Sequence, residues 1–286
     1  MKKGHGETIR RGSPKPIGGG RFAALAVGLL VAVACMVGVQ KCSHRNERPF
    51  SSALPEKSGG DTIDVAIEIS PLAYSLAGDT VSGLDYDLLR AMASRHGRAV
   101  KFHPFAPLQF ALDGLENGNF DILVAALPST RKLKSRLRLT ESVYLDREVL
   151  VQRAGDSTLV RSQGELAGKT VWIPDGSPIR ERIENLADEI GDSIIVRQEP
   201  GRTSEHLVML VAAGEVERAV VNEGIARSLR VAHGNVDIST PVSFTQFQVW
   251  ALNPANKQLA DTIDSWLRQF KATPEYRNLL RRYHHE

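Results

Sequence analysis

Two short stretches of sequence decide the fold: Val65-Ala66-Ile67-Glu68-Ile69, and then Gly83-Leu84-Asp85-Tyr86-Asp87-Leu88. The first is mostly apolar and short, which predicts a strand that is buried in a sheet. In the second, the leucines at 84 and 88 repeat every fourth residue and continue to Met92, which predicts a helix with one apolar face. Ser82, three residues before Asp85, fits a capping box for that helix. A buried strand followed by such a helix begins a β–α–β unit, and therefore a parallel sheet.

The same alternation of strand and helix continues along the chain and then restarts. Further strands are expected at residues 100–105 and 122–126, and after the restart at 170–173, 194–197 and 219–221. Helices are expected from Leu108 to Gly118, after Ser177-Pro178, after Thr203, from Glu223, and twice after residue 252. The chain therefore contains two α/β units in tandem.

Two more strand-like segments, residues 144–151 and 246–252, join these units. Because the chain crosses twice, it returns to complete the first unit after forming the second. We predict an α/β fold of two lobes, with two open and mostly parallel sheets joined by two crossing strands. Lobe 1 comprises residues 61–153 and 246–286, and the inserted lobe 2 comprises residues 154–245. Two hinged lobes are suited to closing on a small ligand.

The charge of the chain is divided unevenly. Residues 1–60 hold ten Lys/Arg and three Asp/Glu, whereas residues 61–286 hold 26 basic and 30 acidic residues. The expected lobes therefore have no net attraction for polyanions, and nucleic acid is excluded as a first hypothesis. Both cysteines, Cys35 and Cys42, precede the lobes, so a disulfide framework or a cysteine-based zinc site in the lobes is excluded as well.

The N-terminal region predicts a membrane attachment. Residues 1–21 are basic, and the 18 residues of the segment 22–39 carry no charge. As a helix that segment would span about 27 Å, close to one bilayer core. We expect a cytoplasmic tail (1–21), a transmembrane or signal-anchor segment (22–39) and a linker (40–60), with the lobes in the periplasm or outside the cell. The alternative is a lipoprotein in which Cys35 carries the lipid.

Motifs that follow one another along residues 61–286 resemble a known family. They are Gly83 to Leu88, Leu112-x-x-Leu115-x-x-Gly118-x-x-Asp121, Leu139 to Tyr144, Leu166 to Val171 with Asp175-Gly176-Ser177, and Gly214 to Asn222. In this order they resemble the type 2 periplasmic solute-binding proteins of family 3, the polar amino-acid-binding group. Ser204-Glu205 and Gln248 to Ala251 are similar to the solute-binding half of the membrane-bound lytic murein transglycosylase F group, without its catalytic domain.

The resemblance and the residues together suggest six ligand-binding positions: Tyr74, Arg131, Gly176, Ser177, Asn222 and Glu223. Arg131 follows the third strand, where the resemblance implies an arginine that clamps a carboxylate. Gly176 and Ser177 open a helix whose N-terminus suits an anion. Each position also has a purely structural interpretation: a solvated arginine in a basic run, an ordinary cap, or a surface aromatic for Tyr74.

Two departures from the family pattern bear on the ligand. Pro128 stands where the family has a threonine hydroxyl, and neutral Asn222 stands where its aspartate holds an amino group. Glu223, beside it, is the candidate substitute. A free α-amino acid is therefore a less obvious ligand than family membership alone implies.

The sequence offers little for an enzyme. It contains no nucleophile elbow, no His-Glu-x-x-His and no phosphate-cradling loop, so neither a catalytic set nor a metal or cofactor is expected. We expect an anchored binding protein that closes on a small polar or anionic, amino-acid-like ligand for transport or sensing, with a permease or signalling protein as partner. The alternatives are a module that binds peptidoglycan fragments and a dehydratase-like enzyme using Glu223 as its acid.

Overall fold

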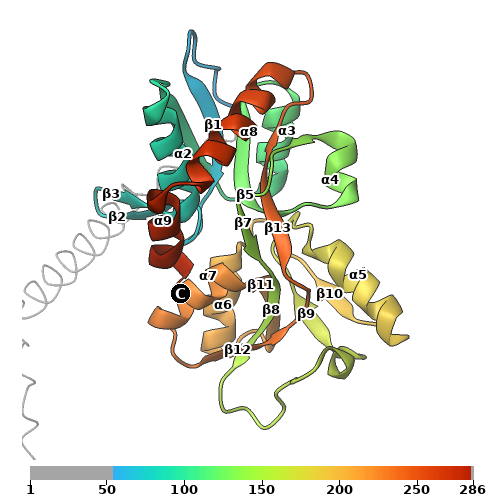
Figure 1. Ribbon diagram of the computed structural model, residues 1–286. Coiled ribbons are helices and arrows are strands. Elements are labelled where there is room, and N and C mark those ends of the chain that lie inside the picture. The colour runs from blue at the N-terminus through green and yellow to red at the C-terminus, as the bar shows by residue number, and fades with distance from the viewer. Residues whose placement is uncertain (1–53, 285–286) are drawn as a thin grey trace, which may run out of the picture. The chain divides into compact units, whose positions relative to one another are not determined.

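The computed structural model describes residues 54–284, which form two α/β lobes (Figure 1). The first part of lobe 1 comprises β1 (Ile63–Glu68), β2 (Ser75–Ala77), β3 (Thr80–Ser82), α2 (Leu84–Arg95), β4 (Val100–Phe105), α3 (Leu108–Glu116), β5 (Ile122–Pro128), α4 (Arg131–Arg136), β6 (Arg138–Leu139) and β7 (Tyr144–Asp146). After lobe 2 the chain returns through β13 (Gln246–Leu252), α8 (Lys257–Lys271) and α9 (Pro274–His284). The sheet of this lobe has the order β4-β1-β5-β13-β6, and β7 pairs with β13.

Lobe 2 is formed by the intervening segment. It comprises β8 (Glu148–Arg153), a 3-10 turn η1 (Gln163–Leu166), β9 (Thr170–Trp172), α5 (Ile179–Ile190), β10 (Ile195–Arg197), α6 (Ser204–Ala213), β11 (Arg218–Asn222), α7 (Glu223–Ala232) and β12 (Val236–Pro241). Its sheet has the order β10-β9-β11-β8-β12. The predicted α/β architecture of two lobes is confirmed, but the sheets are mixed and not mostly parallel, because β13 in lobe 1 and β8 in lobe 2 pair only antiparallel.

The first crossing segment differs in detail from its prediction as one strand. β7 pairs with β13 in lobe 1, whereas β8 pairs with β11 and β12 in lobe 2, so the chain changes sheets at Arg147. Lobe 2 therefore begins at β8, ahead of residue 154. On the return, the chain leaves β12 and enters the lobe 1 sheet as β13. The two connections between the lobes, which we call the hinge segments, are Arg147 and residues 242–245.

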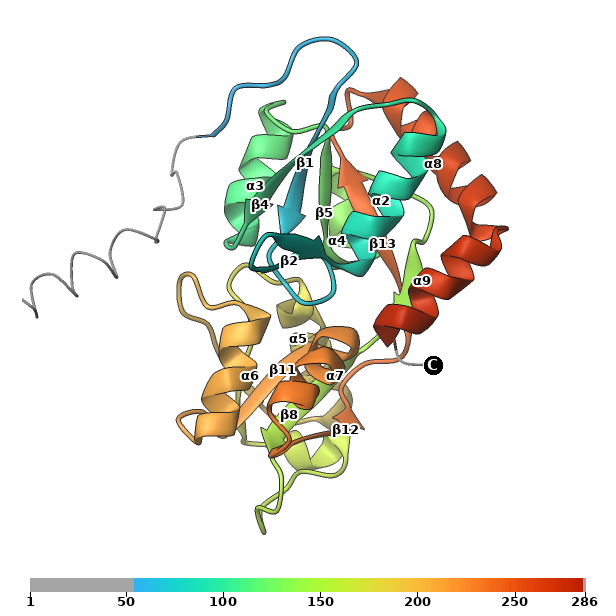
Figure 2. The same cartoon turned by 90° about the vertical axis from the view of Figure 1, so that its left-hand side faces the viewer.

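Helices cover both faces of each sheet. In lobe 1, α2 and α8 pack on one face and α3 on the other. In lobe 2, α6 and α7 pack on one face and α5 on the other. The buried apolar residues beneath α2 and α8 belong to the same cluster as those beneath α6 and α7, so one core runs through the hinge. Helix α9 contacts both α2 and α7 and therefore bridges the lobes on this side (Figure 2).

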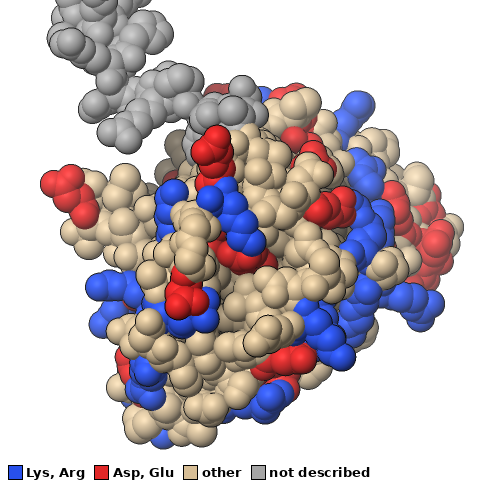
Figure 3. Space-filling view, turned by 90° about the horizontal axis from the view of Figure 1, so that it is seen from above, with Lys and Arg blue, Asp and Glu red and all other residues tan. Residues whose placement is uncertain are grey.

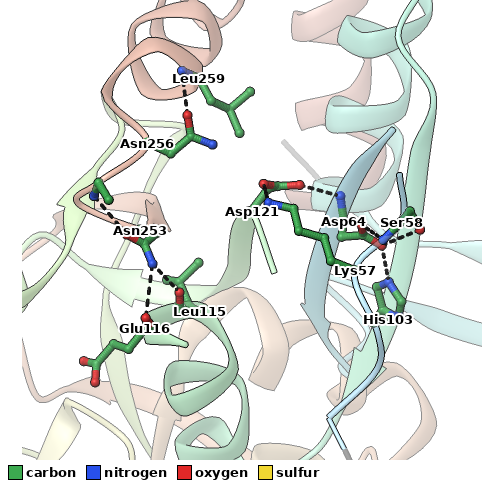
Figure 4. Close-up of polar contacts among 11 residues, drawn as sticks. Lys57, Ser58, Asp64, His103, Leu115, Glu116, Asp121, Asn253, Asn256 and Leu259 are labelled. Atoms are coloured by element: carbon green, nitrogen blue, oxygen red, sulfur yellow. Dashed lines mark hydrogen bonds and ion pairs between the residues drawn. The ribbon is translucent and has the colours of Figure 1, made fainter. Parts of the chain in front are cut away.

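The last residues of the expected linker bind at the end of the lobe 1 sheet where its parallel strands begin (Figure 4). The buried carboxylate of Asp64 accepts from Ser58 N at 2.7 Å, from Ser58 Oγ at 2.9 Å, and lies 2.8 Å from His103 Nε2. Burial alone would raise the pKa of Asp64, but these bonds outweigh it and lower that pKa. Asp121 accepts from Asp64 N and pairs with Lys57 Nζ at 2.7 Å. Leu54 packs in the apolar cluster beside α3. The segment from Leu54 to Ser58 is thus an integral part of lobe 1.

The surface of this end of the molecule carries both signs of charge. Basic and acidic side chains are interspersed with uncharged ones in the view from above (Figure 3). Within residues 54–284, no helix combines the length and hydrophobicity needed to cross a bilayer. The expected span at 22–39, the basic tail and Cys35 all lie outside the described residues.

The start of α2 corrects the expected capping box. Gly83, not Ser82, is the N-cap of α2, and no side chain caps this end. Gly83 has φ +148°, and a Cβ placed on it would lie 2.2 Å from the carbonyl oxygen of Ala73. This close approach allows the amides of Leu84 and Tyr86 to donate to the loop at Leu72 and Ala73. A glycine is required here because the loop and the helix meet backbone to backbone.

We expect Gly83→Ala to destabilise the protein by about 3 kcal/mol or more, since it combines a disfavoured φ with a clash against backbone. Gly78→Ala is the control: its φ is +60°, but a Cβ there meets nothing within 4 Å. That variant should cost only about 1–2 kcal/mol. Thermal and urea unfolding would measure both, and equal losses would show that the loop adjusts to a side chain.

Candidate functional site

The topology of lobe 1 places a crevice at the carboxyl ends of β1 and β5. From β1 the chain crosses through α2 to β4, and from β4 it crosses through α3 to β5 on the other side of β1. Ligands of open α/β sheets bind where the crossovers diverge in this way. The residues that end these strands are Glu68 and Pro128.

Lobe 2 repeats the arrangement with β9 and β11. Its crossovers diverge between these strands, which are followed by the loop 173–178 and by Asn222 at the start of α7. A pocket of about 260 Å³ lies between the lobes, where α3 and α4 of lobe 1 face α5 of lobe 2. Its lining includes Gln109, Thr130, Lys132, Leu133 and Arg136 from lobe 1, and Gly176, Ser177, Arg180, Glu181 and Gln198 from lobe 2. We call the space between the four strand ends the interlobe crevice.

The lobes touch on both sides of this crevice. A Cβ placed on Gly176 would lie 3.7 Å from Gln109 N, so the loop before α5 rests against the first turn of α3. On the other side, a Cβ on Gly224 would lie 3.0 Å from the side chain of Leu72. The structure therefore represents a form in which the lobes are in contact.

Arg131 is the first residue of α4, after Thr130, whose Oγ1 accepts from Leu133 N at 3.2 Å. The Arg131 residue is exposed and does not line the interlobe pocket. Lys132 and Arg136, from the same helix, do line it, and Arg136 is paired with Glu116 at 2.6 Å. The cations on the lobe 1 side of the pocket are therefore Lys132 and Arg136. They belong to the same helix as Arg131, the residue expected from the sequence.

Gly176 and Ser177 both line the pocket. Ser177 Oγ accepts from Ile179 N at 3.2 Å, although Pro178 is the N-cap residue of α5. Arg180, in the first turn, donates to the side-chain oxygen of Gln198. The helix terminus expected from the sequence therefore faces lobe 1 across the pocket.

Tyr74 lies elsewhere in lobe 1, in the loop that follows β1. It is half-buried, and its ring stands edge-on to that of Tyr86 with centroids 5.7 Å apart. Burial and the neighbouring Tyr86 raise the pKa of Tyr74. It does not line the pocket between α4 and α5.

Asn222 and Glu223 differ in what they offer a ligand. Burial alone would raise the pKa of Glu223, but hydrogen bonds from Arg147 and Arg227 outweigh it and lower that pKa. Arg147 donates to both carboxylate oxygens, at 2.7 and 3.1 Å, and Arg227 donates at 2.9 Å. Asn222, by contrast, is buried, and its Oδ1 has no hydrogen-bond partner within residues 54–284. The unused acceptor therefore belongs to Asn222.

Two residues at the crevice escaped the sequence analysis. Glu68 Oε2 accepts from Ala126 N at 3.3 Å, and burial raises the pKa of Glu68 to about 7. Gln248 in β13 is 1% exposed, and both ends of its amide lack a partner among the described residues. A carboxylate that ends an apolar strand was a usable signal for Glu68. Gln248 gave none, because only the pairing of β13 with β5 and β7 brings it opposite Pro128 and Tyr144.

Within residues 54–284, no cluster of three or more His, Cys, Asp or Glu side chains is arranged to hold a metal ion. Glu141, in the motif Leu139 to Tyr144 ahead of the first crossing strand, is exposed and pairs with Arg268 on α8. Its role in this structure is therefore to tie that loop to α8.

We expect Gln248→Leu to raise the free energy of unfolding by about 1–2 kcal/mol, because it removes a buried amide that has no protein partner. Gln152→Leu is the matched control. Gln152 is equally buried, but it bonds Val160 N and Val160 O, each at 2.8 Å. Its loss should cost about 1–3 kcal/mol. Urea unfolding of both variants would test this, and destabilisation by Gln248→Leu would mean that ordered water satisfies the amide.

Comparison with known proteins gives a consistent family. A family model described as bacterial extracellular solute-binding proteins, family 3, matches residues 62–286. Membrane-bound lytic murein transglycosylase F of Desulfosudis oleivorans is 25% identical over 90% of this chain and 55% of its own length. The transglycosylase F of Shewanella pealeana is 24% identical over 83% of this chain and 48% of its own. The chain spans about half the length of these relatives.

Solved structures share the fold at low identity. An ancestral arginine-binding protein bound to glutamine superposes with a TM-score of 0.69 at 19% identity, covering 80% of this chain and all of that one. The ligand-binding core of GluR0 in complex with L-glutamate gives 0.67 at 15% identity, covering 79% and 99%.

Proposed function

This chain belongs to the bacterial extracellular solute-binding proteins of family 3, and we propose that its lobes close on a small polar or anionic, amino-acid-like ligand. The observation that carries the proposal is a pocket lined from both lobes, beside the loops that follow β5 and β9. Buried polar atoms without partners within residues 54–284, Asn222 Oδ1 and the Gln248 amide, lie at the carboxyl ends of β11 and β5, although neither residue lines this pocket.

The two sides of the crevice favour a dipolar ligand. Lys132 of α4 supplies a cation to the pocket, and Arg136, which is already paired with Glu116, supplies a second; both suit a negative group. Asn222 Oδ1 and the carboxyl of Glu68 supply acceptors, which suit a donor such as an amino or amide group. Glu223 takes no part in this contact, because two arginines already neutralise it.

A second function is a module that recognises fragments of peptidoglycan. Its support is the similarity over 90% of this chain to a membrane-bound lytic murein transglycosylase. Mass spectrometry of whatever co-purifies with the protein distinguishes the two functions, since a muropeptide carries a sugar or D-amino acids and a transported amino acid does not. The dehydratase alternative loses its candidate acid, because the lowered pKa of Glu223 keeps that carboxyl ionised.

We expect the anion contact to lie on α4, and alanine variants of Arg131, Lys132 and Arg136 locate it. Loss of the cation that meets a desolvated carboxylate costs about 2–5 kcal/mol, or roughly 30-fold to several thousand-fold in affinity. Arg138→Ala is the control, because Arg138 pairs with Asp261 at 2.7 Å outside the pocket. Calorimetry with the ligand that co-purifies measures all four. If all the variants lose under about 1 kcal/mol of binding free energy, equally and in a salt-sensitive way, then α4 is only a solvated basic patch and does not contact the anion.

We also propose that the lobes face the periplasm or the cell exterior while the chain remains attached to the membrane, with a permease or signalling protein as partner. The proposal rests on the basic residues 1–21 and the uncharged segment 22–39.

A reporter enzyme that is active only outside the cytoplasm, fused after Glu286, should be active in the membrane fraction. Activity of a cytoplasm-only reporter at the same position would contradict this topology. Cys35→Ser distinguishes the attachments: it abolishes lipid labelling if Cys35 carries a lipid, and has no effect if the segment spans the membrane.

A further inference from the structure

Exposed apolar side chains gather where the chain crosses between the lobes. Leu145 in β7 and Phe247 in β13 are 56% and 60% exposed, and Phe244, in the second hinge segment, is 82% exposed. Leu145 and Phe247 are register partners in the antiparallel pair of these strands (Figure 1), so their side chains lie next to each other on one face. Phe244 precedes Phe247 by three residues, a reach of at most about 11 Å. We call these three residues the hinge patch.

The hinge patch differs from the rest of the described surface. The other large apolar side chains exposed within residues 54–284 lie singly on four elements: Leu76 on β2, Ile195 on β10, Met209 on α6 and Val231 on α7. Single residues of this kind are normal on a soluble protein, whereas a contiguous group that includes aromatic rings marks a contact with another molecule. The hinge patch therefore has the composition of an interface.

Two hollows flank Phe247. One, of about 410 Å³, is lined mainly by apolar and aromatic side chains of β7, β13 and α9. The other, of about 530 Å³, lies beside β6 and is lined by residues 137–142 together with side chains of β13. Ser142, Phe247 and Lys271 line both, so the hollows adjoin and form one groove, which we call the hinge groove.

The wall of the hinge groove on the α9 side is held by a hydrogen bond. Tyr276, in the first turn of α9, donates from its Oη to Val143 O at 2.6 Å, just ahead of β7. The helix is thereby fixed against the first crossing strand, and the hollow between them exists without an occupant. A preformed hollow of this kind reduces the ordering cost of binding.

The hinge groove also carries cations that have no partner. Lys271, the last residue of α8, is half-buried, and burial lowers its pKa although the charge of Glu141 opposes this effect. Within residues 54–284, the ammonium groups of Lys271 and of Lys134, in the second hollow, form no ion pair or hydrogen bond. The other two charged side chains of the groove, Arg138 and Glu141, are paired with residues of α8. A negative group is therefore the missing partner.

This combination fits an acidic and apolar segment of another protein. The apolar side chains of such a segment fill the hollow between β7 and α9, and its carboxylate meets the ammonium of Lys271. An anionic membrane surface fits less well, because a flat surface does not fill hollows. In addition, residues 61–286 hold 26 basic and 30 acidic residues and so have no net attraction for it.

We propose that the hinge patch and the hinge groove bind a partner protein, through a segment that carries apolar side chains and at least one carboxylate. This surface is separate from the interlobe pocket, since Lys134, Lys271 and the three residues of the hinge patch do not line that pocket. The proposal therefore goes beyond the proposed function and does not depend on the ligand.

Photo-crosslinking of the full-length protein in its own bacterium tests the proposal. A benzophenone amino acid that replaces Phe244 or Phe247, one at a time, should form a covalent adduct with a partner protein. The same amino acid in place of Val231 or Met209, which are 79% and 47% exposed on other elements, should form no such adduct. All four positions are exposed, so the substitutions leave the core intact. Mass spectrometry of the adduct identifies the segment that is bound.

A synthetic peptide with the sequence of that segment then measures the contacts. Phe247→Ala should weaken its binding roughly 30-fold, as expected for an aromatic side chain at the centre of an interface. Lys271→Gln should weaken it at least about tenfold, because a desolvated carboxylate loses its cation. Lys257→Gln, at the exposed other end of α8, is the matched control and should have no effect. Replacing the acid of the peptide by its amide should cost little in Lys271→Gln, since the pair is already broken.

Several results would overturn the proposal. They are the absence of an adduct at both phenylalanine positions, adducts with lipid, adducts within this chain or with a second copy, and equal adducts at the control positions. Equal weakening by Lys257→Gln and Lys271→Gln would also overturn it, because the charge would then act only at long range. Failure to find any ligand for the interlobe pocket would remove the proposed function and leave this proposal intact.

Discussion

The position of α2 depends on the contact of the Asp85 carboxyl with the indole of Trp250. The helix begins at Gly83, whose missing side chain allows the backbone to approach Ala73, and its first turn then places Asp85 beneath the hinge. The same turn therefore fixes the loop after β1 and both crossing strands. A first-turn acid usually compensates a helix terminus; here the acid is buried, and its main contact is a tertiary one.

Much of the architecture follows from local patterns. The strands at 122–126 and 170–173 were predicted because each is a short, mostly apolar run between helical repeats, and the structure contains them, as it does the strand predicted at 100–105. The change of sheet at Arg147 was not predicted. Residues 144–151 form one extended run in the sequence, and only their pairing with β13 on one side and β11 on the other divides them.

Less of the candidate site than of the fold could be predicted from the sequence, for physical reasons. The resemblance indicated the loops that meet at the crevice, so Gly176 and Ser177 were found at the pocket. Which residue of α4 faces the pocket depends on the rotation of a helix only 6 residues long, and the sequence does not determine it. Gln248 became notable only because tertiary structure buries its amide without a partner.

The attachment of residues 54–58 to lobe 1 has a mechanical consequence. Lys57 and Ser58 bond Asp121 and Asp64, at the end of the sheet opposite the crevice (Figure 4). A strand of 6 residues separates that edge from the crevice, or about 20 Å. Any load applied through the preceding chain is therefore borne by lobe 1, at the end away from the crevice. Under the proposed closure, lobe 1 is the lobe that is held and lobe 2 is the lobe that moves.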